Sequence, residues 1–264
     1  MQIDLSGRTA FVSGSTQGIG LAIVKGLAAA GAEVVLNGRT QERVDAAVAS
    51  VLDAQPGAAV RGIAADVGSA EGAAVVFEAL PAVDILVNNL GIFAPQDVFD
   101  VDDDTWQRFW DVNVLSGIRL TRHYAQGMRD RGWGRVQFIA SESAVVIPVE
   151  MVHYGVTKTA LLGVSRGYAK ALSGTGVTVN SVIAGPTRTE GVEAFVASLI
   201  GADVPWDEAE KRFIAEHRPT SIIQRLIDPA EIANMTTYLA SEQASATTGG
   251  ALRVDGGQAD HILP

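Results

Sequence analysis

The chain has 264 residues, a formal net charge of −10 and no cysteine. Hydrophobic residues make up 47% of it, enough to fill a large core, which excludes an intrinsically disordered chain. Without cysteine there are no disulfides, thiolate metal sites or thiol nucleophiles. Because 30 acidic residues face 20 basic ones, we expect neither nucleic acid nor a membrane as a partner. We expect a soluble, cytoplasmic protein, since the sequence contains neither a membrane span nor a signal peptide pattern.

Short β-branched segments alternate along the chain with alanine-rich stretches. In chain order, they predict a strand over 9–12, a helix over 18–30, a strand over 33–36, a helix over 41–52, a strand over 60–64, a helix over 70–80, a strand over 83–87, a helix over 105–131, a strand over 135–140, a helix over 152–172, a strand over 177–182, a helix over 228–240 and a strand over 251–254. Such alternation forms right-handed βαβ units around a buried parallel sheet. We therefore predict an α/β fold, a Rossmann-type doubly wound parallel sheet of about seven strands with helices on both faces, in a single domain over residues 1–264.

Residues 187–219 break this alternation with two predicted helices, over 192–200 and 206–216. An insertion of this length in a compact domain is usually a lid or a binding element, so we expect a substrate-binding lid. The aromatic side chains of Phe195, Trp206 and Phe213 would suit a lid, a small core of the insertion itself or a subunit contact.

A glycine-rich turn, Ser-Gly-Ser-Thr-Gln-Gly-Ile-Gly over residues 13–20, joins the first predicted strand to the first helix. Phosphate binding needs close approach to the backbone, N–H donors and the positive end of a helix dipole, and this turn offers all three. A simple tight connection between strand and helix remains the alternative. We predict that the turn binds the pyrophosphate of a dinucleotide through Gly14, Ser15, Gln17, Gly18, Ile19 and Gly20.

The end of the second predicted strand reads Leu-Asn-Gly-Arg-Thr over residues 36–40. An acidic residue there would bind the adenosine ribose hydroxyls of NAD(H) and repel a 2′-phosphate. Instead, Arg39 can pair with a 2′-phosphate through its guanidinium fork, unless it is merely solvated. NADP(H) is therefore favoured over NAD(H).

Tyr154 and Lys158 are four residues apart near the start of a predicted helix. Residues at this spacing share a helix face, so the phenol and the ammonium can point into one cleft. A neighbouring ammonium favours the phenolate, and we expect it to lower the pKa of Tyr154. A surface pair is the alternative.

Further short segments stand out along the chain. They are Asp66-Val67 and Asn88 to Gly91, each after a predicted strand, and also Asn113, Ser141, Asn180 to Thr189 and Leu252 to Gly257. With the glycine turn, in which Ser13 replaces a threonine, and with Tyr154 and Lys158, they resemble the short-chain dehydrogenase/reductase family over essentially the whole chain. Within that family the sequence is similar to reductases of 3-oxoacyl carrier proteins. One departure is Ala184, where the family has proline.

The resemblance implies an oxidoreductase that transfers a hydride between NADP(H) and a carbonyl or secondary alcohol. Tyr154 would exchange a proton with the substrate oxygen, and Lys158 would assist it and hold the nicotinamide ribose. Ser141 would stabilise the charge that develops on the substrate, and Asn113 would hold a water molecule beside Lys158. The implied cofactor contacts beyond the glycine turn and Arg39 are Asp66, Val67, Asn88, Gly91, Tyr154, Lys158, Thr187 and Thr189.

Several alternatives stay open at this level. A non-redox epimerase or dehydratase, or a cofactor-binding regulatory protein, could use the same scaffold. The roles of Glu142 and His153 are undecided, and the other histidines show no metal-ligand spacing, so no metal is expected. A carrier protein would need basic docking residues, for which Arg129 and Arg131 are candidates, whereas Thr175 stands at the second basic position. The expected partner is a small-molecule carbonyl or alcohol, and the resemblance implies a homo-oligomer, a tetramer or a dimer.

Overall fold

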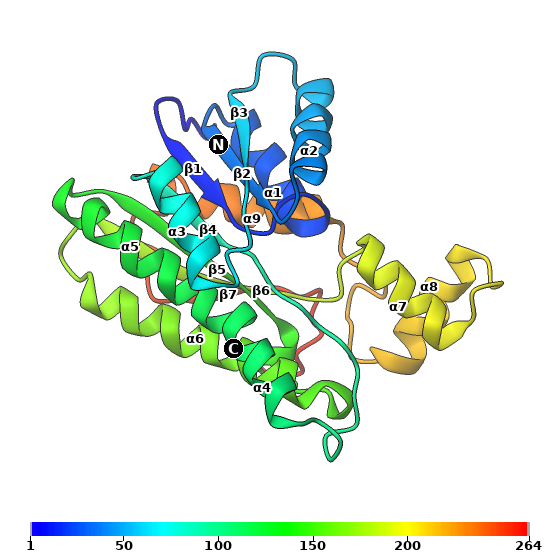
Figure 1. The fold of residues 1–264 in the computed structure, drawn as a ribbon. Helices are drawn as coiled ribbons and strands as arrows, with labels where there is room; N and C mark the ends of the chain where they lie inside the picture. The colour runs from blue at the N-terminus through cyan, green and yellow to red at the C-terminus, as the bar shows by residue number, and fades with distance from the viewer. Residues whose placement is uncertain (1, 263–264) are drawn as a thin grey trace.

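Within residues 2–262, which the computed structural model describes, parallel strands form a seven-stranded sheet in the order β3-β2-β1-β4-β5-β6-β7 (Figure 1). The order reverses between β1 and β4, and ligands of such sheets bind beside this point, at the carboxyl ends of the strands. The predicted Rossmann-type doubly wound sheet is confirmed. The strands are β1 (Thr9–Val12), β2 (Glu33–Gly38), β3 (Val60–Ala64), β4 (Ile85–Asn88), β5 (Gly134–Ser141), β6 (Val177–Ala184) and β7 (Ala251–Val254).

Helices cover both faces of this sheet (Figure 1). Most predicted helices agree with the observed ones to within about two residues at each end. Among the described residues, no helix has the length and apolar character needed to cross a membrane. The helices are α1 (Gly18–Ala29), α2 (Gln41–Ala54), α3 (Ala70–Ala79), α4 (Asp103–Trp110), α5 (Ser116–Asp130), α6 (Val152–Ala171), α7 (Glu190–Ile200), α8 (Trp206–His217) and α9 (Pro229–Leu239).

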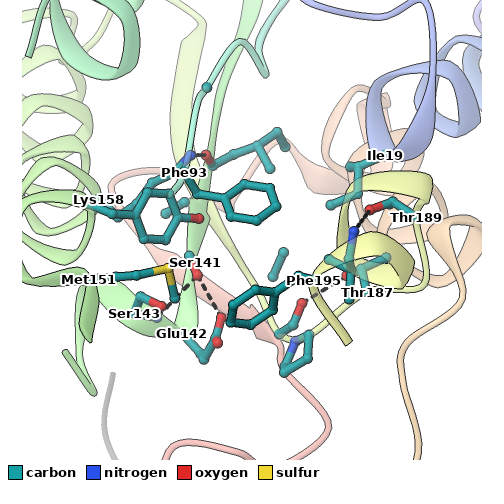
Figure 2. A pocket seen from close by; sticks show the side chains of 18 of the residues that line it. Ile19, Phe93, Ser141, Glu142, Ser143, Met151, Lys158, Thr187, Thr189 and Phe195 are labelled. Atoms are coloured by element: carbon teal, nitrogen blue, oxygen red, sulfur yellow. Dashed lines mark hydrogen bonds between the residues drawn. The ribbon is translucent and has the colours of Figure 1, made fainter. Parts of the chain in front are cut away.

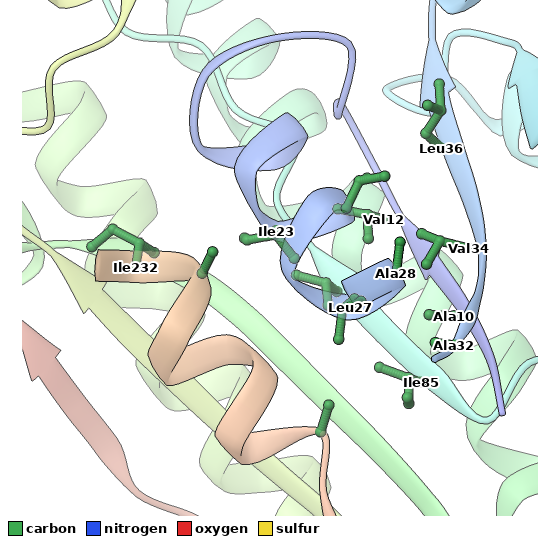
Figure 3. Close-up of a cluster of buried hydrophobic side chains, with 14 of the residues drawn as sticks. Ala10, Val12, Ile23, Leu27, Ala28, Ala32, Val34, Leu36, Ile85 and Ile232 are labelled. Atoms are coloured by element: carbon green, nitrogen blue, oxygen red, sulfur yellow. The ribbon is translucent and has the colours of Figure 1, made fainter. Parts of the chain in front are cut away.

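Two apolar layers, one on each side of the sheet, hold the helices in place. Ala10 and Val12 of β1 belong to the first layer and Phe11 to the second, because successive side chains of a strand point to opposite faces. The first layer, shown in Figure 3, also takes side chains from α1, α2 and α9. The second takes them from α3, α5 and α6. Burial on both faces explains why the strands are apolar almost throughout.

The predicted helix over 105–131 is wrong as a single element, since a π-helical turn, Asp111–Leu115, separates α4 from α5. The buried Asn113 lies in this turn and ties it to two neighbouring segments. Its Nδ2 donates to the carbonyl of Ile92 at 3.0 Å and to Oγ1 of Thr157 at 2.9 Å, and its Oδ1 accepts from the Ile92 N–H at 2.8 Å. Such turns commonly occur at functional sites, and this one orients a side chain beside α6.

The segment 187–219 forms α7 and α8, a pair that Figure 1 shows to one side of the sheet. Phe213 is buried in a small apolar cluster that the segment forms with Leu226, and Phe195 and Trp206 pack against it. The insertion therefore has a core of its own.

Arg135 of β5 is almost completely buried, with 2% of its side chain exposed. Its guanidinium donates to the carbonyls of Ser241 at 3.2 Å, Gly134 at 2.9 Å and Gly176 at 3.2 Å, and it pairs with Glu242 at 3.4 Å. Replacing it with alanine leaves these three carbonyls without their donor. At about 1 kcal/mol for each hydrogen bond, we expect Arg135→Ala to lower the free energy of unfolding by about 3 kcal/mol.

Urea unfolding followed by circular dichroism measures this change. The matched control is Arg129→Ala, because Arg129 is exposed and its ion pair with the adjacent Asp130 is exposed too. We expect the control to stay within about 0.5 kcal/mol of the wild type. Equal effects of the two substitutions would show that the buried contacts of Arg135 contribute nothing specific.

Candidate active site

A pocket opens at the carboxyl ends of β4, β5 and β6, and Figure 2 shows its lining side chains. It contains about 870 Å³ of empty space, including its open mouth. Ser141 at the end of β5 and Tyr154 and Lys158 on α6 meet in it, as the sequence predicts for a single cleft. Much of the remaining wall is apolar, with Phe93, Met151, Val192, Phe195 and Phe213.

Ser141 is held by its two neighbours in the chain. Its hydroxyl donates to Oε2 of Glu142 at 2.6 Å, and its oxygen accepts from the N–H of Ser143 at 3.1 Å. Glu142 is buried, and burial raises the pKa of its carboxyl group, although Ser141 and Arg218 act in the opposite direction. The one hydroxyl proton of Ser141 thus points at a carboxyl group inside the pocket.

The Tyr154 phenol faces the same group. Burial and the negative charge of Glu142 raise its pKa well above the usual value, while Ser141 and Arg218 lower it less. The expectation that Lys158 lowers the pKa of Tyr154 is therefore wrong for this state of the protein. The Lys158 ammonium lies 5.7 Å from the centre of the Tyr154 ring, and the loss of hydration outweighs its charge.

Lys158 is buried and donates from Nζ to the carbonyl of Ile139 at 2.9 Å. Burial lowers the pKa of its ammonium to about 8, against the opposing effect of Glu142. Gly91 leaves room for this side chain, since a Cβ there would lie 3.2 Å from Nζ and 3.5 Å from Oδ1 of Asn113. Asn113 itself does not line the pocket but holds Thr157, the residue before Lys158.

The glycine turn forms a cradle for an anion at the start of α1. Gly18 has a φ of +56°, which favours glycine, and a Cβ at Gly20 would lie 2.6 Å from the carbonyl oxygen of Gly14. Among the described residues, no side chain caps the start of α1, which leaves its first N–H groups available. The turn therefore fits a pyrophosphate. Gln17 precedes α1 and Ile19 lines the pocket, whereas the Ser15 hydroxyl is buried and donates to the Val12 carbonyl at 2.6 Å.

Arg39 is exposed directly after β2, whose last residue, Gly38, packs against Thr16 of the glycine turn. No acid stands at this strand end: the buried Asn37 donates to the carbonyls of Ile63 and Ala65. The residues around the cradle thus fit a nucleotide that carries a 2′-phosphate.

The other predicted cofactor residues lie at or beyond the carboxyl ends of β3, β4 and β6. Thr187 and Thr189 line the pocket, and Thr189 also caps α7. Asp66 is exposed and accepts from the N–H of Gly68, while the Val67 side chain is buried in the second apolar layer. Asn88 turns away and donates to Thr121 of α5 at 3.0 Å. Its neighbour Asn89 lines the pocket instead.

Two positions that stayed open in the sequence have clear places in the structure. His153 is buried against Phe109, with ring centres 4.3 Å apart, and it does not line the pocket. Glu142 does line it, together with Arg218, whose Nε lies 3.8 Å from Oε1 of Glu142. Sequence reasoning missed Arg218, because it follows α8 far along the chain and belongs to no motif. Within residues 2–262, no group of acidic or histidine side chains is arranged to hold a metal ion.

Known proteins resemble this chain over almost its whole length. The family described as enoyl-(acyl carrier protein) reductase matches residues 14–259. The chain is 51% identical over 258 residues to the oxidoreductase YvaG of Bacillus subtilis, covering 97% of this chain and 98% of that protein. It is 31% identical to the D-beta-hydroxybutyrate dehydrogenase of Cupriavidus necator, covering 96% and 98% of the two chains.

Among solved structures, L-sorbose reductase from Gluconobacter frateurii, complexed with NADPH and L-sorbose, superposes with a TM-score of 0.92. It is 33% identical, and the match covers 99% of this chain and all of that one. The fold, the motifs and these relatives agree. The chain belongs to the short-chain dehydrogenase/reductase family and is an NAD(P)-dependent oxidoreductase.

Proposed function

We propose that this enzyme transfers a hydride between NADP(H) and a small-molecule carbonyl or secondary alcohol, with Tyr154 as the proton donor in the direction of reduction. The observation that carries the proposal is the meeting of Ser141, Tyr154 and Lys158 in one pocket beside the glycine cradle. The bound nicotinamide supplies the hydride. The chain itself holds the substrate oxygen and supplies its proton.

The raised pKa of Tyr154 makes the phenol a weaker acid, but the phenol keeps its proton at neutral pH and can give it to the carbonyl oxygen. Ser141 lies in the same pocket, and its hydroxyl can donate to that oxygen when it turns away from Glu142. The positive charge of Lys158 stabilises the phenolate that remains after proton transfer. Asn113 positions α6 through Thr157, which supports the inference that it also orders water near Lys158.

The choice of NADP(H) depends on Arg39. We expect Arg39→Ala to raise the Michaelis constant for NADPH by about 10- to 100-fold, as the loss of a charge-assisted fork to phosphate of about 1.5–3 kcal/mol implies. The constant for NADH should change by less than about twofold, since NADH has no 2′-phosphate. The matched control is Arg212→Ala, an exposed arginine on α8 paired with Glu216. Equal effects of Arg39→Ala on both cofactors would contradict this assignment.

The reaction itself is tested by a screen of ketones, aldehydes and secondary alcohols, with NADPH and NADH in parallel and absorbance at 340 nm as the readout. Reduction of a carbonyl compound with preference for NADPH supports the proposal. The alternatives, an epimerase or a dehydratase, predict tightly retained nucleotide and conversion of substrate without a net change in absorbance.

A 3-oxoacyl group on a carrier protein is less well supported as the substrate. Arg129 pairs with Asp130 at 3.1 Å, and Arg131 pairs with Asp84 at 3.5 Å and donates to the carbonyl of Val83. Both candidate docking residues are thus engaged within the chain. A relative named 3-oxoacyl-[acyl-carrier-protein] reductase from Aquifex aeolicus is 31% identical, so the reaction class remains compatible.

We also propose that the protein is a cytoplasmic homo-oligomer, a tetramer or a dimer, and that residues 187–219 act as a lid over the substrate. Exposed apolar side chains support the oligomer, since Phe99 is 95% exposed and Val149 is 81% exposed. Val192, Phe195 and Phe213 of the insertion reach the pocket and support the second. Light scattering after size exclusion measures the oligomeric state.

A further inference from the structure

Two largely buried side chains, Glu142 and Arg218, form an ion pair in the lining of the candidate active site. Glu142 and Arg218 both line the pocket that holds Tyr154, and their side chains are 9% and 12% exposed. Oε2 of Glu142 accepts from Ser141, whereas Oε1 lies 3.8 Å from Nε of Arg218, beyond hydrogen-bonding distance. A carboxylate oxygen and a guanidinium thus face each other with their hydrogen-bonding capacity incompletely used.

The same pair also borders a second, more polar cavity. Glu150, Glu216, His217 and Gln258 contribute to its walls. Within the described part of the chain, Oε1 of the buried Gln258 has no hydrogen-bond partner. The Glu142–Arg218 pair therefore lies between the pocket and a polar cavity that has an unpaired acceptor in its wall.

Charge and polarity restrict what can bind beside this pair. An alkyl substituent would remove water from Glu142 and Arg218 without replacing its hydrogen bonds, which is costly for buried polar groups. A carboxylate or phosphate would meet Arg218 but also the three acids Glu142, Glu150 and Glu216 around it. A neutral hydroxyl group fits best, because it donates to a carboxylate oxygen and accepts from a guanidinium.

The distance from the reacting atoms gives the position of this hydroxyl on the substrate. Ser141 holds the reacting oxygen in the proposed function, and its own Oγ is 2.6 Å from Glu142. Of all substituents on the substrate, one on the carbon next to the carbonyl is the nearest to this carboxyl group.

We propose that Glu142 and Arg218 are specificity-determining residues that bind a hydroxyl group on the carbon next to the reacting carbonyl. The substrate class is then the neutral α-hydroxy ketones, ketoses among them. This inference rests on the proposed carbonyl reduction. It assigns to these two residues the recognition of a hydroxyl group on the substrate.

The test compares three ketones of nearly equal size with NADPH as cofactor: hydroxyacetone, butanone and pyruvate. They differ only in one substituent, a hydroxymethyl, an ethyl or a carboxylate group. We expect wild-type kcat/KM for hydroxyacetone to exceed that for each of the other two by at least about 100-fold, because a site that hydrogen-bonds a hydroxyl strongly rejects analogues without it.

The variants Glu142→Leu and Arg218→Met should each lower the ratio of kcat/KM for hydroxyacetone over butanone by at least about 10-fold. Glu142→Gln should keep part of the ratio, since its amide still offers an acceptor oxygen. The matched control is Glu150→Gln, which borders only the second cavity and should leave the ratio within about twofold. Binding of NADPH, measured by fluorescence, shows that each variant is folded.

Measurable reduction of all three ketones with equal kcat/KM would overturn the inference but not the proposed function. Preference for pyruvate would assign Arg218 to a carboxylate and overturn it too. An unchanged ratio of kcat/KM for hydroxyacetone over butanone in both Glu142→Leu and Arg218→Met would also overturn the inference. If the wild type binds NADPH but reduces no ketone, aldehyde or ketose, the proposed function itself fails and the inference fails with it.

Discussion

The substitution Tyr154→Phe is expected to lower kcat/KM for carbonyl reduction by about 10²- to 10⁴-fold, the usual contribution of a positioned general acid. It removes a single oxygen and keeps the aromatic ring, which packs edge-on against Phe93 with ring centres 6.2 Å apart. The pocket should therefore keep its shape. Steady-state assays at 340 nm with NADPH and the best substrate of the screen measure the loss.

Tyr168→Phe is the matched control for this experiment. Tyr168 lies on the same helix, α6, and is partly buried like Tyr154, but its hydroxyl is directed to the carbonyl of Ile118 and not into the pocket. We expect its kcat/KM to stay within about twofold of the wild type. Turnover by Tyr154→Phe at the wild-type rate would show that another group supplies the proton.

The electrostatics of the pocket bear on the proposed role of the phenol as the proton donor. Burial acts on both ionisable partners of the pair and favours their neutral forms, raising the pKa of Tyr154 and lowering that of Lys158 to about 8. Glu142 raises both values, so its negative charge holds a proton on the phenol and on the ammonium. Glu142, a residue outside the family motifs, thus influences the protonation of both proposed catalytic groups.

The sequence predicted the fold correctly where a pattern of residues is local and recurs along the chain. Apolar strands that alternate with helices predicted the sheet, because burial on both faces leaves a pattern in every strand. The Tyr154–Lys158 spacing predicted that these two side chains share one cleft, because the motif is short and lies on one helix. The interrupted helix around Asn113 escaped the periodicity, since a single π turn adds only one residue to a helical pattern.

The remaining errors come from effects that a sequence does not record. The ammonium of Lys158 suggested a lowered pKa for Tyr154, but the sequence does not show how completely the phenol loses its water. Arg218 reaches Glu142 only because the segment with α7 and α8 packs beside the pocket, and its position in the chain gives no hint of this contact. Pocket residues outside the sequence motifs, such as Arg218, are therefore harder to predict than the motif residues.

Lys158→Met tests the cost of burying this ammonium through the pH dependence of stability. The pKa in the folded state is about 8, below the usual value of 10.5, so below pH 8 both states are protonated and the folded state bears the full desolvation cost. Between pH 8 and 10.5 the unfolded state binds more protons, and the wild type gains about 1.4 kcal/mol of stability per pH unit relative to Lys158→Met. Urea unfolding at several pH values measures this difference.

The matched control is Lys170→Met, because Lys170 lies on the same helix but is exposed. Its difference in unfolding free energy from the wild type should stay within about 0.5 kcal/mol across the range. We also expect Lys158→Met to lower kcat/KM at every pH below 8, where the wild type carries the charge that stabilises the phenolate. A stability difference between wild type and Lys158→Met that does not change with pH would mean that the buried amine does not titrate in this range.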